Sequence, residues 1–156
     1  MEDNNTYRGN QHLIIIGWNE RVKDLLSYFD EPLSQNEMVL IDNTLEEASA
    51  LPHSIHFIKG DPTDPQTFLK ANIQHATGIL ITAELNKEEE EADINSILSL
   101  VASKGTNPFI HSVVEILTSK HVINARHAGA DQIIQRSLPI SRIMYDKFFE
   151  KNSSIR

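Results

Sequence analysis

Short apolar runs recur along the chain, and their alternation with more polar segments constrains the fold more than any other feature. The runs are four to six residues long, as in HLIII at 12–16 and MVLID at 38–42. Runs of this length are typical of strands that are buried on both faces of a parallel sheet. We predict six strands, at 12–16, 38–42, 55–58, 78–82, 109–114 and 131–134.

Helix signals fill the intervals between these runs. Asn19 and Asp64 stand where helix N-caps are expected, and Thr44 and Glu47 have the spacing of a capping box. Gly129 suits the left-handed end of a helix. Helices are predicted over 22–29, 44–51, 65–72, 86–104 and 118–127. Alternating strands and helices predict one α/β domain, a Rossmann-like, doubly wound parallel sheet of six strands in the order 3-2-1-4-5-6.

A last helix, within 138–151, is apolar around much of its circumference. Its apolar residues are Ile140, Ile143, Met144, Tyr145, Phe148 and Phe149. This surface is larger than one sheet face can cover, so we predict a homodimer interface at Ile140, Ile143, Met144 and Phe148. The alternative is that the helix packs on its own domain. The chain then divides into a polar tail or linker at 1–11, the Rossmann-like lobe at 12–136, and the dimerisation helix and tail at 137–156.

Composition excludes several classes of function. The chain has 22 acidic and 14 basic residues and a formal charge of −8, with no Lys/Arg cluster, so nucleic acid is not an expected partner. No apolar run approaches the roughly 20 residues that span a membrane, and the polar residues 1–10 do not resemble a signal peptide. We therefore expect a cytoplasmic protein with no direct membrane insertion. The lack of cysteine excludes a thiolate metal site or nucleophile.

Ligands of a sheet with this strand order bind beyond the carboxyl ends of the strands, where the order reverses. The residues predicted at that edge are Gly17, Trp18, Asn19, Asp42, Asn43, Gly60, Asp61 and Thr82. Compared with the G-x-G-x-x-G fingerprint, Gly17 is present, but Asn19 and Val22 replace the second and third glycines. These side chains disfavour NAD in its usual pose. Asp42 follows Gly17 by 25 residues, near the ~20-residue spacing of a ribose-binding carboxylate. A nucleotide site and an empty, degenerate pocket both remain open.

The segments GWNERV, VLIDN, FIKGDPTD, GILIT and HAGADQII, followed by a final helix, resemble the RCK family. These regulators of K⁺ conductance are also called KTN or TrkA-N domains, and the resemblance covers 12–149. It implies a cytoplasmic ligand-sensing domain that gates a potassium channel or K⁺ transport system at the inner face of the membrane. It also implies homodimers that assemble into rings, and adenine nucleotides (AMP, ADP, ATP or NAD) held by Gly17, Asp42 and Asp61.

Calcium-gated members of that family carry carboxylates after the fourth and fifth strands. The corresponding residues are Thr82, Glu115 and Leu117, of which only Glu115 is a carboxylate. Ca²⁺ takes 6 to 8 oxygen ligands, so we do not expect Ca²⁺, and Glu115 is the one candidate metal ligand. We do not expect the chain to be an enzyme, because the sheet and its helices account for most of its length and leave no substrate domain. The alternatives are a stand-alone nucleotide-binding or assembly module, or an NAD(P)-dependent oxidoreductase fragment.

Overall fold

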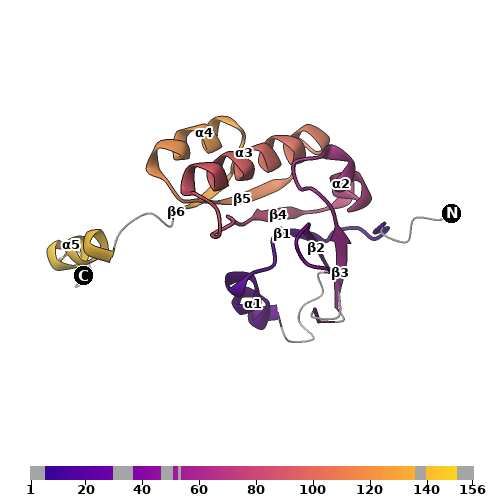
Figure 1. Ribbon diagram of the computed structural model, residues 1–156, viewed down its shortest axis with the longest axis horizontal. Helices are drawn as coiled ribbons and strands as arrows, with labels where there is room; N and C mark the ends of the chain where they lie inside the picture. Colours follow the sequence, from indigo (N-terminus) through magenta and orange to yellow (C-terminus); the bar gives the residue numbers. More distant parts are fainter. Residues whose placement is uncertain (1–5, 30–36, 47–50, 53, 136–139, 151–156) are drawn as a thin grey trace.

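Six parallel strands form one open sheet in the order β3-β2-β1-β4-β5-β6 (Figure 1). The computed structural model describes residues 6–29, 37–46, 51–52, 54–135 and 140–150, with side chains from Ile143 onward in the last range. The strands are β1 Leu13–Ile16, β2 Met38–Asp42, β3 Ile55–Lys59, β4 Gly78–Ile81, β5 His111–Ile116 and β6 Gln132–Gln135. The predicted fold class and strand order are confirmed.

Helices cover both faces of this sheet, with α1 on one face and α2, α3 and α4 on the other (Figure 1). Their bounds are α1 Glu20–Leu26, α2 Pro65–Lys70, α3 Glu89–Thr106, α4 Val122–His127 and α5 Ile140–Phe149. The predicted caps are present: the Asn19 side chain accepts a hydrogen bond from Val22 N, and the Asp64 side chain accepts one from Gln66 N. Gly129 has the expected positive φ of 108°.

Two local predictions need correction. Residues 44–46 are not helical, because the Asp42 carboxylate draws the N–H groups of Thr44 and Leu45 into a turn at 2.9 and 2.6 Å. The rest of that predicted helix, at 47–50, lies outside the described residues. Helix α3 begins at Glu89 instead of residue 86, and it does not stop before Gly105 but continues to Thr106, whose hydroxyl donates back to the Ala102 carbonyl at 3.0 Å.

The core forms one layer on each face of the sheet because successive strand residues point to opposite faces. Ile14 and Ile16 of β1 pack in the larger layer, beneath Phe68 and Leu100. Ile15 packs in the smaller layer with Val22 of α1. Together the two layers bury both faces of the sheet, and the carboxyl ends of its strands form the edge where ligands of this fold bind.

Helix α3 packs on the sheet mostly with small and polar side chains, together with Leu100, while several of its large apolar side chains lie on the outer side. The buried residues on this side are Ala92, Asp93, Ser96, Ser99, Leu100, Ala102 and Ser103. Ile94, Leu98 and Val101 lie on the outer side with 44–52% of their surface exposed. Small residues let the helix axis approach the sheet closely, and the outer side of α3 is therefore an apolar surface.

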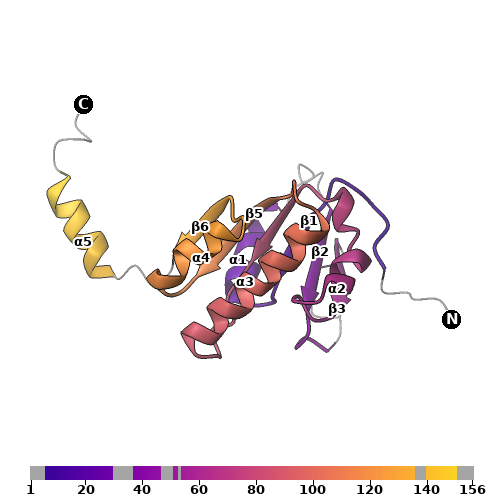
Figure 2. The ribbon, with the colours of Figure 1, turned by 90° about the horizontal axis from the view of Figure 1, so that it is seen from above.

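Helix α5 lies away from the sheet and its covering helices in both ribbon views (Figures 1 and 2). Its apolar side chains are open to solvent, with Met144 64% and Phe148 76% exposed. The side chain of Ile140, part of the predicted dimer interface, lies outside the described residues. Within the described part of the chain, no helix is long and apolar enough to cross a membrane.

Candidate ligand-binding cleft

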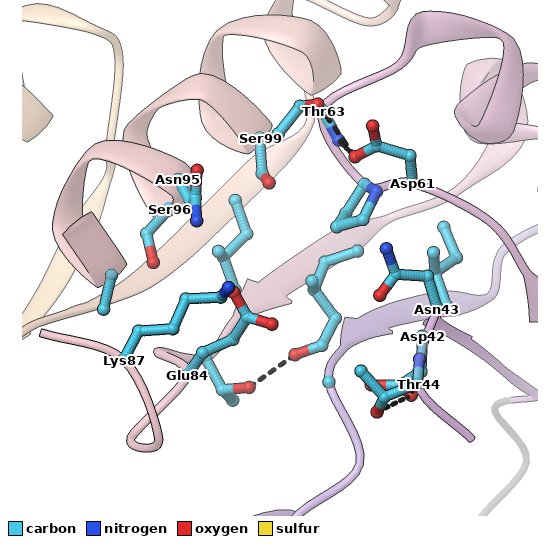
Figure 3. A pocket seen from close by; sticks show the side chains of 17 residues that line it. Asp42, Asn43, Thr44, Asp61, Thr63, Glu84, Lys87, Asn95, Ser96 and Ser99 are labelled. Carbon is cyan, nitrogen blue, oxygen red and sulfur yellow. Dashed lines mark hydrogen bonds between the residues drawn. The ribbon is translucent and has the colours of Figure 1, made fainter.

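A cavity of about 430 Å³ opens at the carboxyl ends of the strands (Figure 3). Its floor is apolar and is made by Ile16, Ile41 and Ile81, which lie at or next to the ends of β1, β2 and β4. These three strands meet where the strand order reverses, which is the position the fold predicts for a ligand. The volume lies within the range of small-molecule sites.

Polar side chains from four parts of the fold form the walls of this cavity (Figure 3). They lie at the end of β2, follow β2, β3 or β4, or come from α3, and they are Asp42, Asn43, Thr44, Asp61, Thr63, Thr82, Glu84, Lys87, Asn95, Ser96 and Ser99. An apolar floor with convergent polar walls can hold a flat, polar-edged molecule such as a nucleoside.

The turn after β1 is closed by side chains. Gly17 has a φ of 103°, and a Cβ placed there would lie 2.4 Å from the Thr82 hydroxyl oxygen. The Asn19 amide nitrogen donates to that hydroxyl at 3.1 Å, and the Thr82 hydroxyl donates to the Ile16 carbonyl. Asn19 therefore crosslinks the turn to the end of β4, in the place where the fingerprint would have an open glycine.

The two aspartates of the cleft are held in fixed positions by nearby donors. Asp42 accepts hydrogen bonds from the N–H groups of Trp18, Thr44 and Leu45 and from the Thr44 hydroxyl. Asp61 accepts from the N–H and hydroxyl of Thr63 at 2.9 and 2.8 Å. Both carboxylates are preorganised, and Asp42 in particular already accepts four hydrogen bonds from within the protein.

Glu115 lies beside the cleft at the end of β5, and Arg21 of α1 binds it with a guanidinium fork. Arg21 Nε and Nη2 donate to the two carboxylate oxygens at 2.8 Å each. The Ala83 N–H donates to Glu115 Oε1, and Arg21 Nη2 also reaches the Ala83 carbonyl. Among the described residues, no group of three His, Asp or Glu side chains is placed to hold a metal ion. Its role as a metal ligand stays a prediction.

The cavity brings together five of the eight predicted ligand residues: Gly17, Asp42, Asn43, Asp61 and Thr82. The other three predicted residues, Trp18, Asn19 and Gly60, do not line the cavity but support its walls from outside. Trp18 packs against the core with Lys23 5.6 Å from its ring, and Asn19 crosslinks the turn. A Cβ on Gly60 would collide with Thr67 at 2.9 Å.

Sequence reasoning missed the contribution of α3 and of the segment before it, namely Glu84, Lys87, Asn95, Ser96 and Ser99. A signal was present in the helical spacing of the small residues at 92, 96, 99 and 103, which marks a face that approaches a neighbour closely. That signal locates the packed face of the helix. It does not show that one end of the face borders a cavity.

A separate group of titratable side chains surrounds His12 at the opposite, amino end of the sheet. His12 is buried, with Nε2 2.8 Å from the Ala71 carbonyl, and Tyr7 packs on its ring at 4.5 Å. Burial lowers the pKa of His12. Burial and the hydrogen bond to Glu37 raise the pKa of Tyr7 to about 12. This cluster anchors the segment before β1 and is remote from the cleft.

The doubly wound sheet, with a cleft at its reversal point, defines a Rossmann-type domain. The family model of the TrkA-N domain matches residues 13–136, and the chain belongs to this family. The resemblance seen in the sequence is thereby confirmed.

Relatives of the chain include channel proteins. It is 41% identical over 148 residues to the "Putative potassium channel protein YugO" of Bacillus subtilis, covering 95% of this chain and 45% of that protein. The chain thus spans less than half the length of this relative. The TrkA-N domain of the inner membrane protein ybaL from Escherichia coli superposes with a TM-score of 0.75 at 15% identity, covering 90% of this chain and 98% of that one. The GsuK channel bound to NAD superposes with a TM-score of 0.69 at 16% identity, covering 92% and 23%. At these identities, the two structures show the fold alone.

Proposed function

We propose that the chain is a cytoplasmic ligand-sensing domain that gates a potassium channel or K⁺ transport system, with an adenine nucleotide as its ligand. One observation carries this proposal: a formed cavity lies at the sheet's reversal point in a chain whose 41%-identical relative bears the name of a potassium channel. The domain catalyses no reaction. Its output is a change in the arrangement of paired domains, which a linked pore detects.

The cleft fits the adenosine part of such a ligand. Ile16, Ile41 and Ile81 provide an apolar bed, while Asn43 and Asp61 provide acceptors and donors at its edge. Solved structures with the same fold include GsuK bound to ADP and GsuK bound to NAD. Gly17, Asp42 and Thr82 hold the cleft in shape. Asp42 Oδ1 accepts one hydrogen bond, from the Trp18 N–H, and so keeps the capacity to accept a second one from a ribose hydroxyl.

Pairing of two copies would transmit the signal. Helix α5 exposes Ile143, Met144 and Phe148 to solvent, and a second copy of the same helix would cover them. The outer side of α3, with Ile94, Leu98 and Val101, is a second apolar surface that would join dimers into a ring. Ligand binding regulates the pore only if the nucleotide binds one arrangement of the assembly more tightly than another.

The test is a chimera in which this chain replaces the matching part of YugO, with K⁺ flux measured in proteoliposomes. We expect AMP or ADP to change the flux severalfold, and we expect Asp61→Ala, an exposed cleft variant, to lose the response while keeping the basal flux. Flux that does not depend on any adenine nucleotide, from a chimera that conducts and is folded, would contradict the proposal.

A further inference from the structure

The cavity occupies only one half of the crevice that a dinucleotide needs. Its lining comes from the ends of β1, β2 and β4, the turn after β3 and helix α3, and no described residue of β5 or β6 contributes. A dinucleotide in a doubly wound sheet lies across the reversal point, with one nucleotide in each half. Beyond β4, the Arg21 guanidinium is fixed between the Ala83 carbonyl and Glu115 at 2.8 Å. A second nucleotide would have to displace this partly buried ion pair.

A pyrophosphate usually binds between the two halves of the crevice, at the backbone N–H groups of the turn after β1. In this chain, side chains already accept hydrogen bonds from these groups. The Val22 N–H is bonded to the Asn19 side chain, and the Trp18 N–H is bonded to Asp42. Glu20 adds a carboxylate to the first turn of α1, next to where the pyrophosphate of a dinucleotide would lie. The backbone at this turn cannot approach a pyrophosphate closely, and the nearby cations Arg21 and Lys23 are paired with Glu115 and Glu20. The structure therefore does not fit NAD in its usual pose.

A different group is available to bind phosphate. Lys87 is the one cation among the described residues that line the cavity, and its side chain extends toward the space between α3 and the strand ends (Figure 3). Its ammonium lies 3.7 Å from Glu91 in an exposed i,i+4 pair, which is a weak interaction that a dianionic phosphate can replace. Ser96 and Asn95 line the cavity on the same side and can donate to phosphate oxygens.

We propose that this cleft is specific for a nucleoside monophosphate, with Lys87 as the phosphate-binding cation, and that the Arg21–Glu115 pair excludes dinucleotides. This inference rests on the proposed function, since it names the ligand class of the same cleft. The wall also carries Glu84, which disfavours longer, more highly charged phosphate chains. Specificity for a monophosphate arises from the single cation Lys87 and from the Arg21–Glu115 pair, which blocks the second half of the crevice.

Titration calorimetry of the purified chain with adenosine, AMP and NAD⁺ tests the proposal. We expect AMP to bind about tenfold more tightly than either of the others, as one charge-assisted contact allows. Lys87→Ala should weaken AMP binding to the level of adenosine and leave adenosine unchanged. Lys120→Ala is the matched control, because Lys120 pairs with Glu90 at 3.0 Å outside the cavity, and it should change neither affinity.

Two outcomes would overturn the inference while leaving nucleotide sensing intact: NAD⁺ binding as tightly as AMP, or a preference for AMP over adenosine that survives Lys87→Ala. If none of the three compounds binds to the folded chain, both the inference and the proposed nucleotide-sensing function fail.

Discussion

The Arg21–Glu115 pair offers a sharp test, because it joins two elements that are 94 residues apart in sequence at the edge of the cleft. Glu115 is 4% exposed and accepts three hydrogen bonds of 2.8 Å from Arg21 and Ala83. Replacing Arg21 by alanine leaves a buried carboxylate with much of its stabilisation removed. Breaking a fully buried pair costs about 3–5 kcal/mol, and the partial exposure of Arg21 brings our expectation to about 2–3 kcal/mol.

The assay is urea unfolding followed by circular dichroism, on Arg21→Ala, Glu115→Ala and the double variant. We expect each single variant to lose about 2–3 kcal/mol and the double-mutant cycle to give a coupling energy of at least about 1 kcal/mol. Glu20→Ala is the control, because Glu20 and Lys23 form an exposed pair, and it should lose no more than about 0.5 kcal/mol. A coupling energy below about 0.5 kcal/mol would refute the view that this pair is a rigid closure of the cleft.

Three further predictions concern assembly, pH and the turn. Ile143→Asp with Phe148→Asp should convert a dimer to a monomer in dilution light scattering, while Lys147→Ala should not, and a wild-type monomer at micromolar concentration would contradict the interface. Burial lowers the pKa of His12, so the unfolded chain gains its proton at a higher pH than the folded chain does. The free energy of unfolding should therefore fall as the pH drops below the ordinary His pKa of 6.5, less steeply in His12→Gln, and an equal slope in both proteins would count against this. Asn19→Ala should destabilise the chain by about 1 kcal/mol through loss of the α1 cap, and an unchanged midpoint in urea would argue against the role of the cap.

The sheet could be predicted from the sequence because its signals are local. Each buried strand is a continuous apolar run, and short connections leave few choices for strand order. The helix caps at Asn19 and Asp64 were predictable for the same reason, since each cap bonds to a residue two or three positions away. The clearest departure is at 44–46, where the Asp42 carboxylate competes successfully with helix formation for the N–H groups of Thr44 and Leu45.

The cleft was only partly predictable, because its remaining residues are brought in by tertiary packing. The apolar periodicity of Ile94, Leu98 and Val101 predicts a helix but not that this side faces outward. The close fit of the small side of α3 places Asn95, Ser96 and Ser99 at the cavity, a contact that no local pattern records. Likewise, Glu115 could be identified as a lone carboxylate, while its partner Arg21 could be identified only in three dimensions.

The central claim is that this cleft binds an adenine nucleotide, and a thermal-shift panel with AMP, ADP, ATP, NAD⁺, NADH, Ca²⁺ and Mg²⁺ tests it most directly. A ligand at 100 times its Kd stabilises the folded state by about 2.7 kcal/mol, which corresponds to a rise in Tm of about 5–10 °C for a chain of this size. We predict a saturable rise of this order with AMP, a smaller one with NAD⁺ and none with Ca²⁺. A Tm that no adenine nucleotide changes would contradict the account.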